Sequence, residues 1–121
     1  TQYGEIDVRD AVRAVEMAID HGITLYDTAE VYGPYTSEEL LAKGLGTHRQ
    51  DIVLVTKVGF TYDDSGSKSG SSAVTGRDAS PDHVIKRTEG CLQRLGTDYL
   101  DLCCSFTGLI IRRSMKTRWK P

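Results

Sequence analysis

The stretch IVLVT, residues 52–56, is an almost unbroken apolar run that is followed by the charged Lys57. Its β-branched residues and its continuous apolar run are typical of a central strand. Such strands occur in parallel sheets, whose connections are long crossovers. We therefore expect this segment to be a central parallel strand, with further elements on either side of it along the chain.

The chain before this strand is typical of a helix followed by a strand. Apolar residues recur with the period of an α-helix between Val8 and Ile19, which predicts a helix with one buried face. Asp7 is suited to the N-cap of this helix, and Gly22 to its C-terminal stop. The next segment, residues 23–27 with the sequence ITLYD, is short, rich in β-forming residues and without strict alternation, which predicts a second strand that is covered on both faces.

A further helix is expected between these two strands. Thr36 and Glu39 have the spacing of a capping box, in which each side chain binds a backbone N–H group of the other residue. A leucine-rich segment follows this pair, and two glycines stand at residues 44–46. We therefore expect the helix to begin at Thr36 and to end near these glycines.

The last helix and strand are expected after a long polar segment. Residues 61–80 are rich in Ser, Gly and Asp and lack apolar periodicity, which predicts a long exposed loop. Ser80 and Pro81 are then suited to the N-cap and first position of a helix, and Gly96 to its end. Residues 99–103 would form the third strand.

The order helix, strand, three times over, predicts an α/β fold with a parallel sheet and right-handed crossovers. Two architectures contain such units, the open doubly wound sheet and the (β/α)8 TIM barrel. A barrel needs about 250 residues and eight strands, whereas this chain has 121 residues and is expected to form one domain at most. As a barrel it would be a partial one, with about three βα units of parallel sheet.

The overall composition excludes two classes of protein. Hydrophobic residues make up 39% of the chain and charged residues 26%, and the mean hydropathy is -0.34, unlike disordered or membrane-embedded chains. No apolar run approaches the roughly 18 residues of a membrane span, and no leader sequence precedes the first helical pattern. We expect a cytoplasmic protein without a membrane partner. Cys91, Cys103 and Cys104 lack the spacing of a zinc site and favour reduced thiols.

The charge is unevenly distributed along the chain. Residues 1–102 hold ten of the 15 basic and all 17 acidic residues, which gives -7, and residues 103–121 hold the other five basic residues, which gives +5. The sum is the net charge of -2. A basic block of this kind is typical of an arm that binds nucleic acid or lipid, or of sequence that does not belong to the fold. We expect residues 103–121 to be an irregular basic tail.

Three chemically suited side chains fall at the carboxyl ends of the predicted strands, where functional residues gather in both architectures. Asp27 ends the first strand, Tyr32 follows in the same loop, and Lys57 ends the second strand. An ammonium near a phenol favours the phenolate and lowers the pKa of a tyrosine from about 10, and a carboxylate holds the ammonium in place. Such a tyrosine transfers protons near neutral pH. Spacing alone leaves the alternative of a capping aspartate, a packed tyrosine and a solvated lysine.

Three segments of the chain resemble the aldo-keto reductase family. They are GITLYDTAEVYG at residues 22–33, VLVTKVGF at residues 53–60 and SPDHVIKRTEGCLQRLGTDYLDL at residues 80–102. The most specific element is the motif D-T-A-x-x-Y-G, which is followed by a T-K pair at the end of the next strand. The likeness extends over about residues 3–102.

The resemblance implies a (β/α)8 barrel that uses NADP(H) to reduce aldehydes and ketones by hydride transfer. Tyr32 would be the general acid that protonates the carbonyl oxygen, and Lys57 would lower its pKa. Asp27 would pair with Lys57 on the nicotinamide side of the cofactor. The family's fourth catalytic residue is a histidine, and its position falls on Phe106, which cannot donate a hydrogen bond to a substrate.

The resemblance also sets the expected limits of this chain. Residues 1–102 would be a fragment of an aldo-keto reductase domain, and residues 103–121 an unrelated tail created by a change of reading frame or splicing near Leu102. The family's site for the cofactor phosphate follows strands seven and eight, which the expected elements do not include. We therefore expect no tight NADP(H) binding and no activity of this chain alone, and the sequence leaves its carbonyl substrate and oligomeric state open.

Two other functions stay open as alternatives. Lys57 could form a Schiff base, as strand-end lysines do in barrel lyases. A non-enzymatic interaction fragment could instead bind anionic surfaces or single strands through basic and aromatic tail residues, although we expect no nucleic-acid partner. The tail residues in question are Arg112, Arg113, Lys116, Arg118, Trp119 and Lys120.

Overall fold

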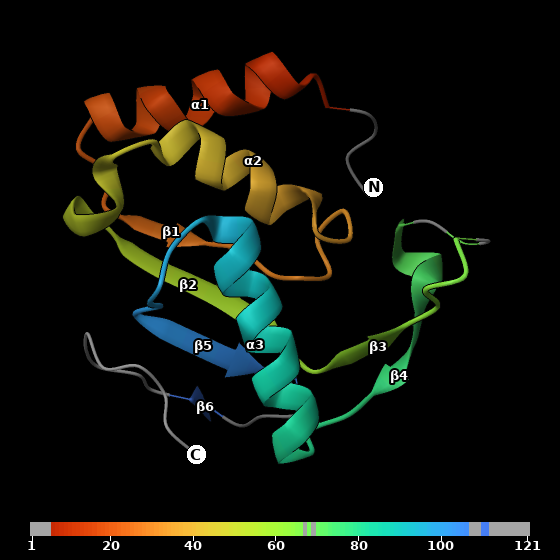
Figure 1. Ribbon diagram of the computed structural model, residues 1–121. Helices are drawn as coiled ribbons and strands as arrows, with labels where there is room; N and C mark the ends of the chain where they lie inside the picture. Colours follow the sequence, from red (N-terminus) through yellow and green to blue (C-terminus); the bar gives the residue numbers. More distant parts are fainter. Residues whose placement is uncertain (1–5, 67, 69, 107–109, 112–121) are drawn as a thin grey trace.

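The computed structural model describes residues 6–66, 68, 70–106 and 110–111, and shows three helices packed on a four-stranded sheet (Figure 1). The sheet has the order β1-β2-β5-β6. Its strands are β1 (Leu25–Asp27), β2 (Val53–Val58), β5 (Leu102–Ser105) and β6 (Ile110–Ile111). The helices are α1 (Val8–Asp20), α2 (Thr36–Leu45) and α3 (Pro81–Leu95). Within the described part of the chain, no helix is long and apolar enough to span a bilayer.

The three predicted helices are confirmed, and their ends follow from local capping. The Asp7 carboxylate accepts the Arg9 backbone N–H at 2.7 Å at the start of α1. Pro81 occupies the first turn of α3, where its missing N–H costs nothing. Gly96 ends α3 in the left-handed conformation, with φ at 62°, which glycine adopts without steric cost.

The predicted parallel sheet is confirmed for three strands. β2 lies between β1 and β5 and is parallel to both, with Leu25 opposite Val53 and Val55 opposite Leu102. The third strand begins at Leu102, later than the predicted residues 99–103. β5 and the antiparallel β6 both reach into the predicted tail, so part of that tail forms the edge of the sheet. Residues 107–109 and 112–121 of the predicted tail lie outside the described residues.

The helices cover one face of the sheet, and α3 crosses over β2 and β5 (Figure 1). Alternate residues of β2, among them Leu54 and Val58, are fully buried against the helices. On the other face Leu25 is 61% exposed and Val53 45% exposed. The expectation that residues 23–27 form a strand covered on both faces is therefore wrong for the described residues, because the three helices lie on the same side of the sheet.

The predicted capping box at Thr36 is also wrong. Tyr35 occupies the N-cap of α2 with a φ of 70° and makes no side-chain capping bond. The Thr36 hydroxyl turns back toward the preceding loop and donates to the Pro34 carbonyl at 3.3 Å. Thr36 thus lies inside the first turn, where its side chain cannot cap the helix.

The segment expected to be an exposed loop contains a small hairpin instead. β3 (Phe60–Tyr62) pairs antiparallel with β4 (Val74–Arg77), and a 3-10 turn at Gly70–Ala73 precedes β4. The hydroxyls of Thr61 and Thr75 lie 3.0 Å apart across the hairpin. Its strands are short, and their register shifts once. Strands of 3 and 4 residues are too short for apolar alternation to be recognised in the sequence.

Candidate active site at the carboxyl ends of the strands

The structure brings Asp27, Tyr32 and Lys57 together at the carboxyl ends of β1 and β2. The Lys57 ammonium donates to the Asp27 carboxylate at 2.6 Å and to the Thr28 carbonyl at 3.1 Å. It also lies 5.4 Å from the centre of the Tyr32 ring, within the range of a cation–π contact. Adjacent parallel strands end at the same edge, which places these side chains side by side.

The three side chains differ in their exposure to solvent. The Lys57 side chain is 21% exposed, whereas the Asp27 side chain is 55% exposed and Tyr32 is 46% exposed. The ammonium is therefore enclosed by its partners, while the tyrosine remains open to a molecule that approaches from solvent. A partly buried charge held beside a phenol is an arrangement suited to proton transfer.

Backbone hydrogen bonds hold the loop that carries Tyr32. The Tyr32 N–H donates to the Ala29 carbonyl at 3.0 Å, and its own carbonyl accepts the Ser37 N–H at 3.1 Å. Gly33 has a φ of 114°, and a Cβ placed there would lie 2.6 Å from the Thr36 hydroxyl. Only glycine fits this position, so the close contact with Thr36 restricts the backbone conformation directly after Tyr32.

Phe106 directly follows β5 and contacts residues of β2 and β3. Its N–H donates to the Val58 carbonyl at 3.0 Å, and its ring packs on the Phe60 ring with centres 4.3 Å apart. The chain's three histidines lie elsewhere and contact other groups. His21 binds the Met17 carbonyl, His48 pairs with Asp51, and His83 binds the Phe60 carbonyl.

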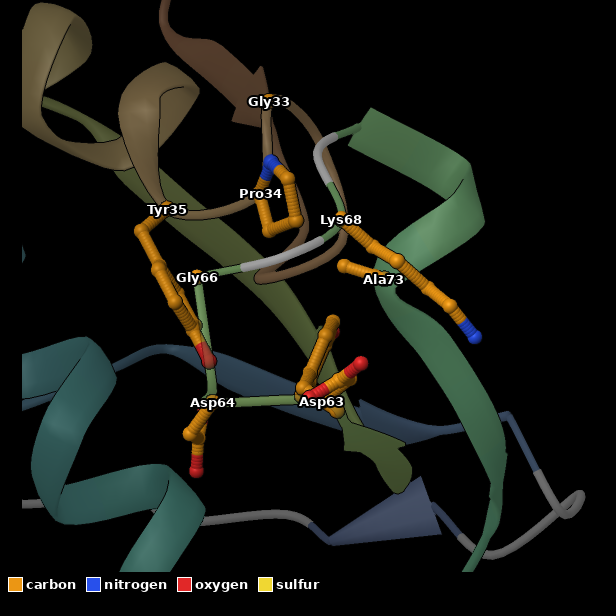
Figure 2. A pocket seen from close by; sticks show the side chains of 9 residues that line it. Gly33, Pro34, Tyr35, Asp63, Asp64, Gly66, Lys68 and Ala73 are labelled. Atoms are coloured by element: carbon orange, nitrogen blue, oxygen red, sulfur yellow. The ribbon is translucent and has the colours of Figure 1, made fainter.

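A cavity of about 340 Å³ opens beside this site, between the β1–α2 loop and the β3–β4 hairpin (Figure 2). Tyr35 and Pro34 line it from the loop, and Ala73 from the hairpin side. Gly33 also lines this cavity and directly follows Tyr32 in the chain, so the cavity lies next to the candidate site. Among the described residues, no group of three or more His, Cys, Asp or Glu side chains is arranged to hold a metal ion.

Sequence reasoning missed two buried carboxylates behind the site. Glu30 is 1% exposed and Glu38 is fully buried. Burial raises the pKa of Glu30, against the opposing effects of Arg87 and Arg94. The signal in the sequence was the pair of arginines, which stand two turns apart on one face of α3.

Comparison with known proteins shows which family the chain resembles. A family model described as "Aldo/keto reductase family" matches residues 1–105. The aldo-keto reductase YhdN of Bacillus subtilis is 32% identical over 104 residues, which make up 84% of this chain and 29% of that protein. The chain thus spans about three-tenths of the length of this relative.

Solved structures give the same result for the fold. The holo form of aldo-keto reductase AKR11C1 from Bacillus halodurans matches with a TM-score of 0.73 and 31% identity, over 84% of this chain and 32% of that one. An aldo/keto reductase from Klebsiella pneumoniae, solved in complex with NADP and acetate, matches with a TM-score of 0.59 and 31% identity, over 79% and 28%. The parallel βα units are part of a (β/α)8 barrel. The chain belongs to the aldo/keto reductase family.

Proposed function

We propose that this chain carries the proton-transfer residues of an NADP(H)-dependent oxidoreductase that reduces aldehydes and ketones. The observation that supports this most is the contact of the Lys57 ammonium with Asp27 at 2.6 Å and with the Tyr32 ring at 5.4 Å. In this proposal the Tyr32 hydroxyl donates its proton to the carbonyl oxygen of the substrate. Lys57 supplies a fixed positive charge beside the phenol, and Asp27 holds the ammonium in place.

The described residues fit only one end of a dinucleotide cofactor. Asp27 lies at the open carboxyl end of the sheet, where a nicotinamide ring would meet Tyr32. The two arginines of α3 are not free to bind the cofactor phosphates, since Arg87 and Arg94 both pair with Glu30. The cofactor supplies the hydride when it is bound. Because these residues include no phosphate cradle, we propose that this chain alone does not hold the cofactor tightly.

We further propose that the chain alone does not turn over carbonyl substrates. Phe106 stands where the family's histidine is expected, and its ring is packed on Phe60. A phenyl ring cannot orient a carbonyl oxygen by hydrogen bonding. The direct test is NADPH oxidation by the whole chain with a panel of aldehydes and ketones. Turnover above background that is lost in Tyr32→Phe would contradict the inactivity while supporting the role of Tyr32.

The role of Tyr32 is tested in a complete barrel. In a chimera, residues 1–105 of this chain replace the matched segment of the Bacillus subtilis relative. The relative then supplies its own residue at the position of Phe106 and the rest of the barrel. We expect carbonyl reduction by this chimera, and a loss of about 100-fold or more in kcat on Tyr32→Phe. The matched control is Tyr26→Phe, which removes a hydroxyl that is buried and has no hydrogen-bond partner among the described residues. Equal activity of the two variants would refute the role of Tyr32.

The alternatives receive less support from the geometry. A Schiff base requires a free amine, whereas Lys57 donates to both Asp27 and the Thr28 carbonyl as an ammonium does. Borohydride trapping of a carbonyl compound on Lys57 would reverse this preference. The tail residues of the interaction hypothesis, residues 112–121, lie outside the described residues. The expected cytoplasmic location stays a prediction.

A further inference from the structure

Glu30 is a buried charge in the loop that carries Tyr32. Its carboxylate oxygen Oε1 lies 2.8 Å from Arg87 Nε, an ion pair without hydrogen-bond alignment, and accepts a hydrogen bond from Arg94 at 3.2 Å. Both arginines belong to α3. Glu30 is the only charged residue in the sequence between Asp27 and Glu38. Its side chain contacts the distant helix α3 instead of solvent.

The backbone of Glu30 connects the two candidate site residues. Its N–H donates to the Lys57 carbonyl at 3.1 Å, and its carbonyl accepts the Tyr35 N–H at 2.8 Å. Tyr32 lies between these two points of attachment. A displacement of Glu30 would therefore move the tyrosine relative to the ammonium.

A second carboxylate extends the same connection to β2. The Glu38 carboxylate accepts a hydrogen bond from Arg94 Nε at 2.6 Å and one from the Thr56 hydroxyl at 2.7 Å. Thr56 directly precedes Lys57, so Glu38 links Arg94, and through it Glu30, to the strand that carries Lys57. The Tyr35 hydroxyl completes this buried cluster by accepting from Arg87 at 2.9 Å.

Stability alone is a poor explanation for this cluster. Removing charges from water is costly, and apolar side chains of similar volume often stabilise a protein as well as a buried ion pair does. The second oxygen of Glu30, Oε2, is buried and has no hydrogen-bond partner among the described residues. A directional network is instead suited to fixing where a loop lies.

We infer that Glu30 is a positioning residue, which acts through Arg87 and Arg94 to hold the Tyr32 loop against α3 and so fixes the contact between Tyr32 and Lys57. The inference rests on the proposed function only for the reason why that contact matters. Its test requires no turnover, so an inactive chain or a failed role of Tyr32 would leave the test readable.

The test compares Glu30→Gln with a matched destabilised variant of the whole chain. Leu45→Ala is the control, because Leu45 is buried in the apolar core at the far end of α2 from Tyr32. The first readout is reductive dimethylation of Lys57, measured by peptide mass spectrometry against Lys43 as internal reference. The second is the nuclear Overhauser contact between the Lys57 methylenes and the Tyr32 ring.

We expect Glu30→Gln to raise the relative labelling of Lys57 by about threefold or more and to weaken the ring contact. Leu45→Ala should lower the melting temperature at least as much and leave both readouts unchanged. An unchanged Lys57 in Glu30→Gln, or an equal change in Leu45→Ala, would overturn the inference.

Two further measurements cover the case in which Glu30→Gln does not fold. Arg94→Lys keeps the charge but loses the guanidinium fork, and it should raise the relative labelling of Lys57 as well. In the unaltered chain, the amide hydrogens of Glu30 and Tyr35 should exchange as slowly as those of the central strand. Rapid exchange at these two amides would contradict a loop fixed in place.

Discussion

The guanidinium of Arg49 lies 3.8 Å from the centre of the Tyr99 ring, at the amino ends of the strands and therefore opposite to Tyr32. Arg49 also donates to the Tyr99 carbonyl and to the Asp101 carboxylate, both at 2.9 Å. Asp101 in turn accepts the Leu54 N–H at 2.8 Å. This cluster ties β2 to the segment before β5, and its position predicts a role in stability and not in the candidate site.

We therefore expect Arg49→Lys to destabilise the chain by about 1 to 3 kcal/mol, because lysine cannot reproduce the fork of hydrogen bonds together with the stacked contact. Urea unfolding measures this loss. Arg13→Lys, on the exposed side of α1, is the control and should change little. A loss confined to the Lys57–Tyr32 contact would contradict the assignment to stability.

Asp27→Asn should release Lys57 with little cost in stability. The pair is half open to solvent on the side of Asp27, so its contribution to the free energy of unfolding is expected to be below about 1 kcal/mol. The Lys57 ammonium, however, loses the carboxylate charge that strengthens its shortest hydrogen bond. Its labelling by reductive dimethylation should rise, whereas the unfolding midpoint in urea should hardly move. A large loss of stability would show that the pair is structural.

Gly59 is expected to tolerate no side chain. Its φ is 111°, and a Cβ there would lie 2.8 Å from the Ser105 hydroxyl. Gly22 is a matched control, since it also has a positive φ of 78° but nothing within 4 Å of the position that a Cβ would take. Gly59→Ala should therefore cost more than Gly22→Ala by about 1 to 3 kcal/mol in chemical unfolding, because only Gly59→Ala adds a clash to the backbone strain. Equal losses would exclude the close approach to β5.

The buried thiols make the chain sensitive to alkaline pH. Burial raises the pKa of Cys103 from 9.0 to about 11, and burial also raises the pKa of Cys91. Between pH 9 and 11 an unfolded chain loses these protons while the folded chain keeps them, so the free energy of unfolding falls as the pH rises.

Cys103→Val removes one of these thiols and should flatten the fall between pH 9 and 11. The shift of Cys103 corresponds to roughly 2 to 3 kcal/mol at full ionisation of the unfolded chain. Urea unfolding at a series of pH values measures the slope. A slope as steep in Cys103→Val as in the unaltered chain would exclude Cys103 as its source.

The helices and the parallel strands could be predicted because their signals are local. The Val8–Ile19 periodicity and the stop at Gly96 depend on nearest turns of the chain and need no knowledge of tertiary packing. The hairpin at β3 and β4 could not be predicted, since strands of 3 and 4 residues are too short for a pattern of apolar residues to stand out from the surrounding polar segment. The capping box predicted at Thr36 is wrong for a related reason. The Thr36 hydroxyl binds the Pro34 carbonyl in the loop, and the spacing of Thr36 and Glu39 in the sequence does not indicate this contact.

The same contrast holds for the candidate site. Asp27 and Lys57 could be placed together because parallel strands share one edge, and the structure adds their 2.6 Å contact. Glu30 and Glu38 could not be singled out, since a carboxylate in a loop or first helical turn usually faces solvent. Their burial depends on Arg87 and Arg94, which approach from α3 only after the whole unit has folded.

The antiparallel strand β6 gives the sheet two different edges. Ile110–Ile111 pairs along β5 and is only 2 residues long, whereas among the described residues no strand pairs with the outer side of β1. A closed (β/α)8 barrel pairs both sides of every strand, whereas the antiparallel β6 takes the place of a further parallel strand beside β5. The outer side of β1 is therefore the edge of the described sheet at which a parallel barrel strand would be added.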